Sequence, residues 1–442
     1  MAGVTDKGLA SIGPWPQGVN NMAGEGKLPT DSDGNILALR EADNIDFDRS
    51  GYPRSRAGSI QVLPGELTHS LWSDDHLPFG LFVDDGFLCV IDGSEQADSL
   101  GIEVGHRPMS YALINDRVFY SNRVARGVVG LDLSCHDWAP AQPAGQPDAA
   151  AVTGYGLQEG KYQVAITFTD LLGRESGSTV AVAVQVPENG GIELSNMPQP
   201  PDLVQTPVIN VYCTGPNDQV LRLSESQPSG VNIGAIHAAA RGRTLTTQHL
   251  APMPAAQIVR YGDGRQWVAF GDEVGWSAPL RYGLWNPGKN RMHFNGEVTL
   301  LEPVGGGTGG AGIFVATRKR TMWFGGSDPS NFTQAIVGSA GVIPGSSCMV
   351  PGQVFGLDSD ALVPVWLSTN GKFYAGLPGG QIISMKEGQA VVDNADRAAS
   401  MFRQANGIQH FVAALRSPRK SGLAITDKPV VHVIYDGTND PD

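Results

Sequence analysis

The chain has 442 residues, of which 41% are hydrophobic and 17% are charged. At about 150 residues per domain, this length predicts roughly three domains, or one large repetitive domain with an insert. Lys and Arg number 31 against 44 Asp and Glu, and the resulting net charge of −13 argues against a tight nucleic-acid binder, which needs clustered cations.

No apolar stretch of the sequence approaches the ~18 residues of a membrane span, so no membrane segment is expected. The first residues lack a charged start followed by an apolar core, which argues against a signal peptide. The four cysteines, Cys89, Cys135, Cys213 and Cys348, are far apart and form no C-x-x-C pair. We therefore expect free thiols in a protein made in a reducing cytoplasm.

Residues 1–58 are predicted to form an extended polar arm with one short helix. Apolar side chains at Ile36, Leu39 and Ala42 share one face over residues 36–46, which favours a helix there. The preceding run DSDGN, residues 31–35, has the oxygen content of a calcium loop, but Ala42 stands where such a loop needs its last acidic ligand. We expect a polar turn instead, with Asp33 or Asn35 capping the helix.

Residues 59–145 and 226–442 are predicted to form the blades of a β-propeller. Short apolar runs alternate there with Gly, Asn or Asp turns every ~8–12 residues. Segments 109–122, 258–277 and 364–385 repeat this hairpin form. Such degenerate repeats favour an irregular propeller-like body, although a β-sandwich or an irregular barrel would leave a similar pattern.

Residues 146–225 are predicted to form an inserted β-sandwich of the immunoglobulin or fibronectin type. The alternation is cleaner here, with Tyr162, Val164, Ile166 and Phe168 on one face of a strand. Segments rich in Ala, Pro and Gln at 139–151 and in Ser, Gly and Pro at 225–234 resemble linkers. The expected fold class is therefore all-β, with an arm, a propeller-like body and an inserted sandwich.

Motifs for catalysis, cofactors and metals are weak in this sequence. The loop GGGTGGAG at 305–312 lacks the Lys and the helix of a phosphate cradle, so a hairpin tip is expected. The nine histidines show no ligand spacing, and we expect neither a metal nor a cofactor. The pairs Asp74-Asp75 and Asp84-Asp85 fit solvated hairpin tips, and no catalytic residue is predicted. A propeller-type glycan hydrolase, with acids drawn from different strands, remains an alternative.

A carbohydrate- or receptor-binding module is the second alternative, because such modules use exposed aromatic rings. Most of the eight tryptophans lie in strand-like runs, where packing in the core is expected. Trp15 and Trp138 lie in Pro-rich loops and are the candidates for sugar stacking.

The arm has the most specific pattern in the chain. Arg40, Arg54 and Arg56 stand among Asp43, Asp46 and Asp48, which fits either a local ion-pair network or a surface that pairs with a neighbouring subunit.

The arm also resembles the start of the tail nozzle or tail hub proteins (tail tubular protein B-like) of tailed, chiefly short-tailed, bacteriophages. Three stretches resemble that family: G-x-N-N, A-L-R-x-A-x-N-x-D and G-x-x-R-x-R-x-G. They place matching residues at Gly18, Asn20, Asn21, Ala38, Leu39, Arg40, Ala42, Asn44, Asp46, Gly51, Arg54, Arg56 and Gly58. The run 160–177, with Gly173-Arg174-Glu175-Ser176-Gly177, is similar to the small sandwich often inserted in such proteins.

The resemblance implies a structural role and no enzymatic activity. Proteins of this family form a ring, commonly a homo-hexamer, below the portal and adaptor rings, and the genome leaves through its channel. The implied partners are other copies of the chain, the head-to-tail connector, and tail fibre or spike proteins, with DNA passing unbound. The implied location is the virion tail after assembly in the host cytoplasm. The residues expected at the subunit interface are Asn20, Asn21, Arg40, Asn44, Asp46, Arg54 and Arg56.

Overall fold

The fold is all-β, as predicted, with 49% of the residues in strands. The computed structural model describes residues 14–24, 26–42, 45–48, 50–55, 61, 63, 65, 67–202, 204–230, 235–305, 310–357, 361–385, 390–392, 395–405, 408–416 and 430–435. The chain divides into two compact units, one of residues 63–293 and one that joins residues 1–62 to 294–442. The arm thus belongs to the same unit as the C-terminal strands.

The first unit, residues 63–293, contains three up-and-down antiparallel sheets, each with the meander order of a propeller blade. Their strands, and those of a small two-stranded ladder, are β3 (His69–Ser73), β4 (Phe79–Asp84), β5 (Phe87–Asp92), β6 (Ala97–Glu103); β7 (Ser110–Ile114), β8 (Arg117–Ser121), β9 (Arg126–Val129), β10 (Cys135–His136); β19 (Ile258–Gly262), β20 (Arg265–Phe270), β21 (Glu273–Trp276), β23 (Arg291–His293); and β18 (Ala251–Pro252) with β22 (Leu284–Trp285).

These sheets pack on one another through alternate side chains. Leu81 and Leu88 of the first sheet share a buried cluster with Tyr120 of the second. Phe119, on the opposite face of the second sheet, shares another cluster with Val259 and Val268 of the third. Stacking successive meanders in this way buries both faces of the middle sheet.

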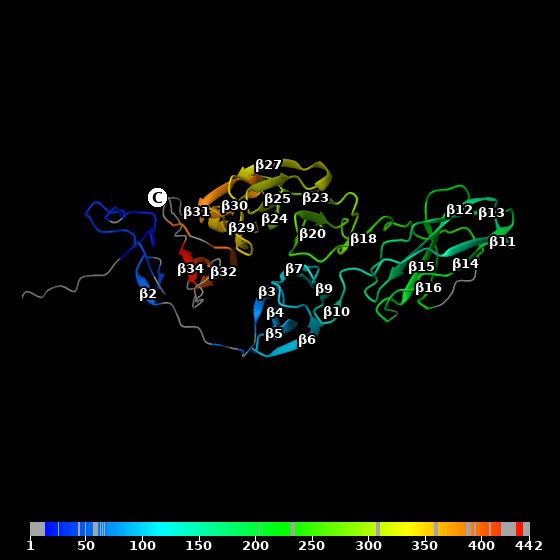
Figure 1. Ribbon diagram of the computed structural model, residues 1–442, viewed down its shortest axis with the longest axis horizontal. Helices are drawn as coiled ribbons and strands as arrows, with labels where there is room; N and C mark the ends of the chain where they lie inside the picture. Colours follow the sequence, from blue (N-terminus) through cyan, green and yellow to red (C-terminus); the bar gives the residue numbers. More distant parts are fainter. Residues whose placement is uncertain are drawn as a thin grey trace, which may run out of the picture. The chain divides into compact units, whose positions relative to one another are not determined.

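The insert between β10 and β18 has two further sheets that face one core. One sheet contains β11 (Asp148–Leu157), β14 (Gly190–Ser195) and β17 (Ala235–Ile236), and the other contains β13 (Val182–Val186), β12 (Gly160–Thr169), β15 (Val208–Cys213) and β16 (Arg222–Pro228). These strands form the teal and green part of Figure 1. Tyr162, Phe168, Val186, Ile192 and Val211 meet in the core. The immunoglobulin or fibronectin class of this insert stays a prediction.

The C-terminal limit predicted for the insert is wrong. Residues 225–228 continue strand β16, and β17 then pairs with β14, so the insert extends to Ile236. Ser226 and Pro228, from the segment that resembled a linker, lie on β16 at the edge of its sheet, which is where strands tolerate proline.

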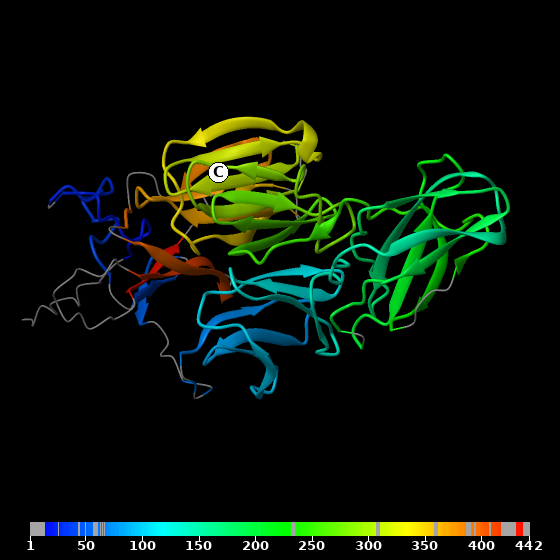
Figure 2. The same cartoon turned by 45° about the vertical axis from the view of Figure 1, so that its right-hand side comes forward.

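The second unit has three stacked sheets of its own in the described residues. Their strands are β24 (Val298–Val304), β25 (Gly312–Thr317), β26 (Thr321–Gly325), β27 (Thr333–Gly338); β28 (Cys348–Pro351), β29 (Leu362–Leu367), β30 (Phe373–Gly376), β31 (Ile382–Met385); and β32 (Arg397–Ala405), β33 (Ile408–Arg416), β34 (Val430–Tyr435). Figure 2 shows the yellow strands of the first of these side by side. Short 3-10 helices lie at Pro329–Asn331, Gly352–Phe355 and Pro378–Gly380.

Two apolar clusters hold this stack together. Phe314 and Trp323 of the first sheet meet Trp366 of the second, and Phe373 of the second meets Phe411 of the third. The hairpins predicted at 109–122, 258–277 and 364–385 are all present as antiparallel pairs. The prediction of an all-β chain built on blade-like meanders is therefore confirmed.

Candidate functional site

The arm, described over much of residues 14–55, has a defined path fixed by two glycines. Gly18 and Gly51 have φ angles of +68° and +81°, which side-chain-bearing residues rarely adopt. Trp15 N donates to Gly51 O at 2.8 Å. A Cβ at Gly51 would lie 2.6 Å from Pro16 N, so only glycine allows this approach.

The helix predicted over 36–46 is wrong in the described residues. Residues 36–42 are irregular, and Ile45–Phe47 forms strand β1, which pairs with β2 (Pro53–Ser55). The backbone of 37–39 bonds outside its own segment: Leu37 N donates to Pro29 O, and Leu39 N donates to Gly18 O. These hydrogen bonds replace the local ladder that a helix needs, and Ala38 is fully buried among the arm's loops.

The oxygen-rich run before this segment is a polar turn, as predicted. Asp31 Oδ1 accepts from Asp33 N at 2.9 Å and from Asn35 N at 2.8 Å. The side-chain amide of Asn35 donates to the other carboxylate oxygen and lowers the pKa of Asp31. Neither Asp33 nor Asn35 caps a helix, because residues 36–42 are not helical.

Asn20 and Asn21 connect the arm to itself and to the rest of its unit. Asn20 is buried, and its Oδ1 accepts from Ala23 N at 3.0 Å. Asn21 forms a pair of hydrogen bonds with the backbone of Val391: its Nδ2 donates to Val391 O at 2.8 Å, and Val391 N donates to its Oδ1 at 3.0 Å. Asn20 therefore shapes the arm itself, and Asn21 fixes it against a segment near β32.

The charged residues predicted on the arm do not form one cluster. Asp46 pairs with Arg403 of β32 at 3.9 Å, and Arg54 pairs with Asp48 at 3.4 Å with its side chain 70% exposed. Arg40 is exposed and forms no ion pair with any described residue. Asn44, Arg56 and Asp43 lie outside the described residues. The arm's described contacts are thus within the chain, and its contact with a neighbouring subunit stays a prediction.

The tryptophans are mainly core residues, as expected. Trp267 and Trp366 are 1% exposed. Trp138 was expected in an exposed Pro-rich loop, and this expectation is wrong: its ring is fully buried, and its Nε1 donates to Gly127 O at 2.9 Å. Trp15, half-buried in the arm, remains a candidate for an exposed ring.

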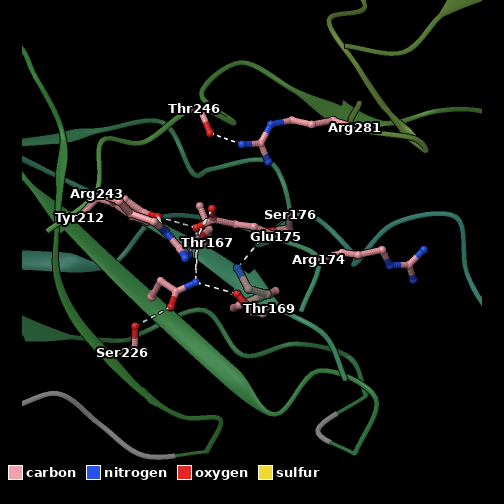
Figure 3. A network of polar contacts seen from close by, with 12 residues as sticks. Thr167, Thr169, Arg174, Glu175, Ser176, Tyr212, Ser226, Arg243, Thr246 and Arg281 are labelled. Carbon is pink, nitrogen blue, oxygen red and sulfur yellow. Dashed lines mark hydrogen bonds and ion pairs between the residues drawn. The ribbon is translucent and has the colours of Figure 1, made fainter. Parts of the chain in front are cut away.

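The insert contains a buried polar network that the sequence analysis did not identify. Glu175 is 9% exposed, and its Oε1 accepts from Thr167 Oγ1 at 2.6 Å and from Tyr212 OH at 2.7 Å. Asn210 Nδ2 lies 3.3 Å from the same oxygen, and Arg243 Nη2 lies 3.4 Å from Oε2 (Figure 3). The network covers the face of β12 and β15 that is turned away from the shared core.

This network explains why a carboxylate tolerates burial. Its oxygens are satisfied by three donors and one cation, which offsets the cost of removing a charge from water. Burial raises the pKa of Tyr212 to about 12, so its hydroxyl stays a donor to Glu175. The carboxylate oxygens of Glu175 are thus held by side chains of the same unit, which fits a structural role for the network.

The neighbouring Arg174 joins the insert to the second sheet of its unit. Its Nε donates to Asp170 Oδ2 at 2.7 Å, and its Nη1 and Nη2 donate to the carbonyl oxygens of Trp138 and Asp137, each at 2.8 Å. Arg126 binds the Asp137 carboxylate through Nε at 3.0 Å and Nη2 at 3.2 Å. We call these five residues the Arg174 clasp.

A hollow of about 430 Å³ opens beside the Arg174 clasp. His136 and Gln205 lie in its wall, with Nδ1 and Oε1 3.1 Å apart. Both arginines of the wall, Arg126 and Arg174, are already bound to Asp137 and Asp170. The hollow thus lies where the insert is attached to the second sheet, and its wall arginines are engaged in that attachment.

The remaining motifs occupy turns. Asp74-Asp75 joins β3 to β4, and Asp84-Asp85 lies at the tight turn between β4 and β5, as predicted. The glycine-rich loop joins the paired strands β24 and β25, which fits a hairpin tip, although residues 306–309 lie outside the described residues. Among the residues that the structure describes, no three His, Cys, Asp or Glu side chains form a metal-binding group, and no helix is long enough to cross a membrane.

No protein-family model matches the chain, and no curated protein matches it. The WD40 domain of SCAP from fission yeast is similar at 6% identity and a TM-score of 0.29, over 85% of this chain and 66% of that domain. The AfRom2 CNH domain is similar at 9% identity and a TM-score of 0.23, over 76% and 84%. The N-terminal domain of Nup159 is similar at 11% and 0.25, over 76% and 71%. TM-scores this low assign neither a fold family nor a function.

Proposed function

We propose that this chain is a structural component of a bacteriophage tail, which forms the nozzle or hub ring below the portal and adaptor rings. The ring, expected to be a homo-hexamer of the virion tail, would retain the genome and conduct it at ejection. Its partners would be other copies of itself, the connector above it, and tail fibre or spike proteins.

The arm is the observation that carries this proposal. The residues that resemble the family are those that shape the arm, including Gly18, Gly51, Asn20, Asn21 and the buried Ala38. A segment with a defined conformation suits assembly, because a preorganised segment loses less conformational entropy when it binds. Arg40 is exposed on this element and available to a neighbour's carboxylate.

The charge pattern supports a conduit as well. The sheet β3–β6, residues 69–103, contains no Lys or Arg and eight carboxylates: Asp74, Asp75, Asp84, Asp85, Asp92, Glu95, Asp98 and Glu103. The net charge of −13 has the same sign, which repels phosphates, and a channel must release DNA rather than hold it.

Single-particle electron microscopy of native particles or lysate tests the proposal. The expected result is a ring of about six copies, coaxial with a channel. A chain found only at fibre tips, or one that never enters a particle, contradicts it.

A glycan array separates the proposal from a carbohydrate-binding module. We expect no glycan bound by the wild-type chain. Binding that is lost on Trp15→Ala would favour the module instead, and turnover of a polysaccharide lost on changing scattered carboxylates would favour a hydrolase.

A further inference from the structure

Three exposed cations form the tip of the hairpin that joins β25 to β26. Arg318, Lys319 and Arg320 follow one another there, and all three are exposed. Arg318 Nη2 donates to the backbone oxygen of Asp396 at 2.8 Å. None of the three forms an ion pair with a described carboxylate, so the charge of this basic tip is not neutralised within the described part of the chain.

A surface of matching chemistry lies on the sheet β3–β6. Phe87 of β5 stands directly opposite Asp84 of β4 and directly opposite Glu103 of β6. Residues opposed in an antiparallel pair point to the same face, so these side chains form one row across three strands. Phe87 is 41% exposed, Glu103 is exposed, and Asp84 is half-buried. We call this set the acidic row.

The acidic row offers two kinds of contact to a cation. Its two carboxylates accept charge-assisted hydrogen bonds, which a guanidinium donates in a planar fork. The exposed ring between them provides a cation–π contact. Asp84 is oriented by Thr68, whose Oγ1 donates to its Oδ1 at 2.6 Å. Glu103 has no ion-pair partner among the described residues.

We propose that the basic tip of one copy of this chain docks on the acidic row of a second copy. The tip carries three cations, and the sheet that receives it carries eight carboxylates and no Lys or Arg, so the two surfaces of one sequence are complementary in charge. The contact joins two different patches and is therefore heterologous, and contacts of that kind form a ring where the rotation from copy to copy closes. This inference rests on the proposed ring and names the residues that hold it together.

Charge reversal on each side, followed by mixing, tests the proposal on the full-length chain. One variant has Lys319→Glu with Arg320→Glu, and the other has Asp84→Lys with Glu103→Lys. Each variant repels itself, and we expect its self-association to be at least about tenfold weaker than that of the wild type. Equimolar mixing makes both contacts between the two variants attractive again, and we expect it to restore assembly. Sedimentation velocity measures the wild type, the two variants and their mixture.

Matched variants control for general charge effects. Asp92→Lys with Glu95→Lys reverses two carboxylates at the opposite end of the same sheet, and Lys289→Glu reverses an exposed cation in another turn. Both should assemble like the wild type. Phe87→Leu should weaken association by about threefold through loss of the cation–π contact alone. Wild-type assembly should also weaken between about 0.05 M and about 0.5 M salt.

Three results would overturn the inference: a wild-type chain that stays monomeric at low salt, reversed variants that assemble normally, or mixing that restores nothing. Rings of the reversed variants would leave the tail proposal standing and remove only this contact. Microscopy of native particles decides the tail proposal separately, because it does not depend on which residues form the interface.

Discussion

Gly51 shows how one residue sets the course of the arm. We predict that Gly51→Ala releases the arm locally at a cost of about 1–3 kcal/mol, because the backbone is left-handed there and the Cβ meets Pro16. Hydrogen exchange over residues 14–55 should rise sharply. Gly24→Ala is the control, since its nearest contact would be the flexible side chain of Lys27 at 3.8 Å. Equal exchange in both variants would contradict the prediction.

Glu175 is the second residue for which the structure predicts a measurable loss of stability on substitution. Glu175→Gln should destabilise the insert by about 1–3 kcal/mol, because it removes the charge opposite Arg243 and turns an amide toward donors that need an acceptor. Hydrogen-exchange protection of β12 and β15 measures the loss. Glu188→Gln, at an exposed turn, should change nothing. Unaltered protection in the first variant would mean that the network contributes little.

Two thiols, the buried Cys213 and the half-buried Cys348, give the stability of the chain a pH dependence. Burial raises the pKa of Cys213 and of Cys348 from 9.0 to about 12. Their contribution to stability is complete below pH 9.0, where both states are protonated, and it is lost as pH rises toward 12, because only the unfolded thiols ionise readily. Iodoacetamide at alkaline pH should label both in urea and neither in the native chain. Rapid native labelling would show that these thiols are accessible.

At the scale of elements, turn residues in the sequence correctly located the hairpins. Sequence patterns failed for segments whose conformation is set by contacts with residues far along the chain. The turns at Asn115-Asp116 and Gly371 favour hairpins through neighbouring residues alone. The arm's helix failed because Leu37 and Leu39 bond to segments that periodicity does not include. Asn21 and Val391 are 370 positions apart, and no spacing in the sequence indicates that they meet.

The candidate site residues show the same contrast between local sequence signals and long-range contacts. Asp46 and Arg54 form ion pairs, but Arg403, which pairs with Asp46, could not be named because strand β32 is so far along the chain. The run 173–177 was noticed only through the family resemblance, because it lies outside the strands and has no hydrophobic periodicity. Burial of Trp138 was equally hidden, because a Pro-rich neighbourhood says nothing of the sheet that covers it.

The Arg174 clasp makes a prediction for the insert as an element. Arg174→Ala should leave the core of the insert folded and loosen its attachment, because the side chain bonds to the backbone oxygens of Asp137 and Trp138. Limited proteolysis over residues 139–147 should accelerate about tenfold through the opened state. Arg222→Ala, at the exposed start of β16, is the control. Cleavage at wild-type rates would show that other contacts suffice.

At the scale of the molecule, the two units differ in how the chain builds them. Residues 63–293 are continuous and contain the clusters around Phe168, Leu81 and Val259. We predict that this fragment folds alone with a cooperative urea transition, whereas residues 294–442 without residues 1–62 show reduced stability. Circular dichroism and fluorescence of both fragments measure this. A fragment 63–293 without a transition would contradict the division.

The bond between Asn21 and Val391 also constrains the timing of synthesis. A ribosome adds about 5–20 residues per second, so Asn21 waits roughly 20–70 s for a partner 370 positions later. A polypeptide released early would expose the arm without its docking segment. Translation would therefore act as a checkpoint, because only chains that extend past Val391 could hold the arm in its docked conformation.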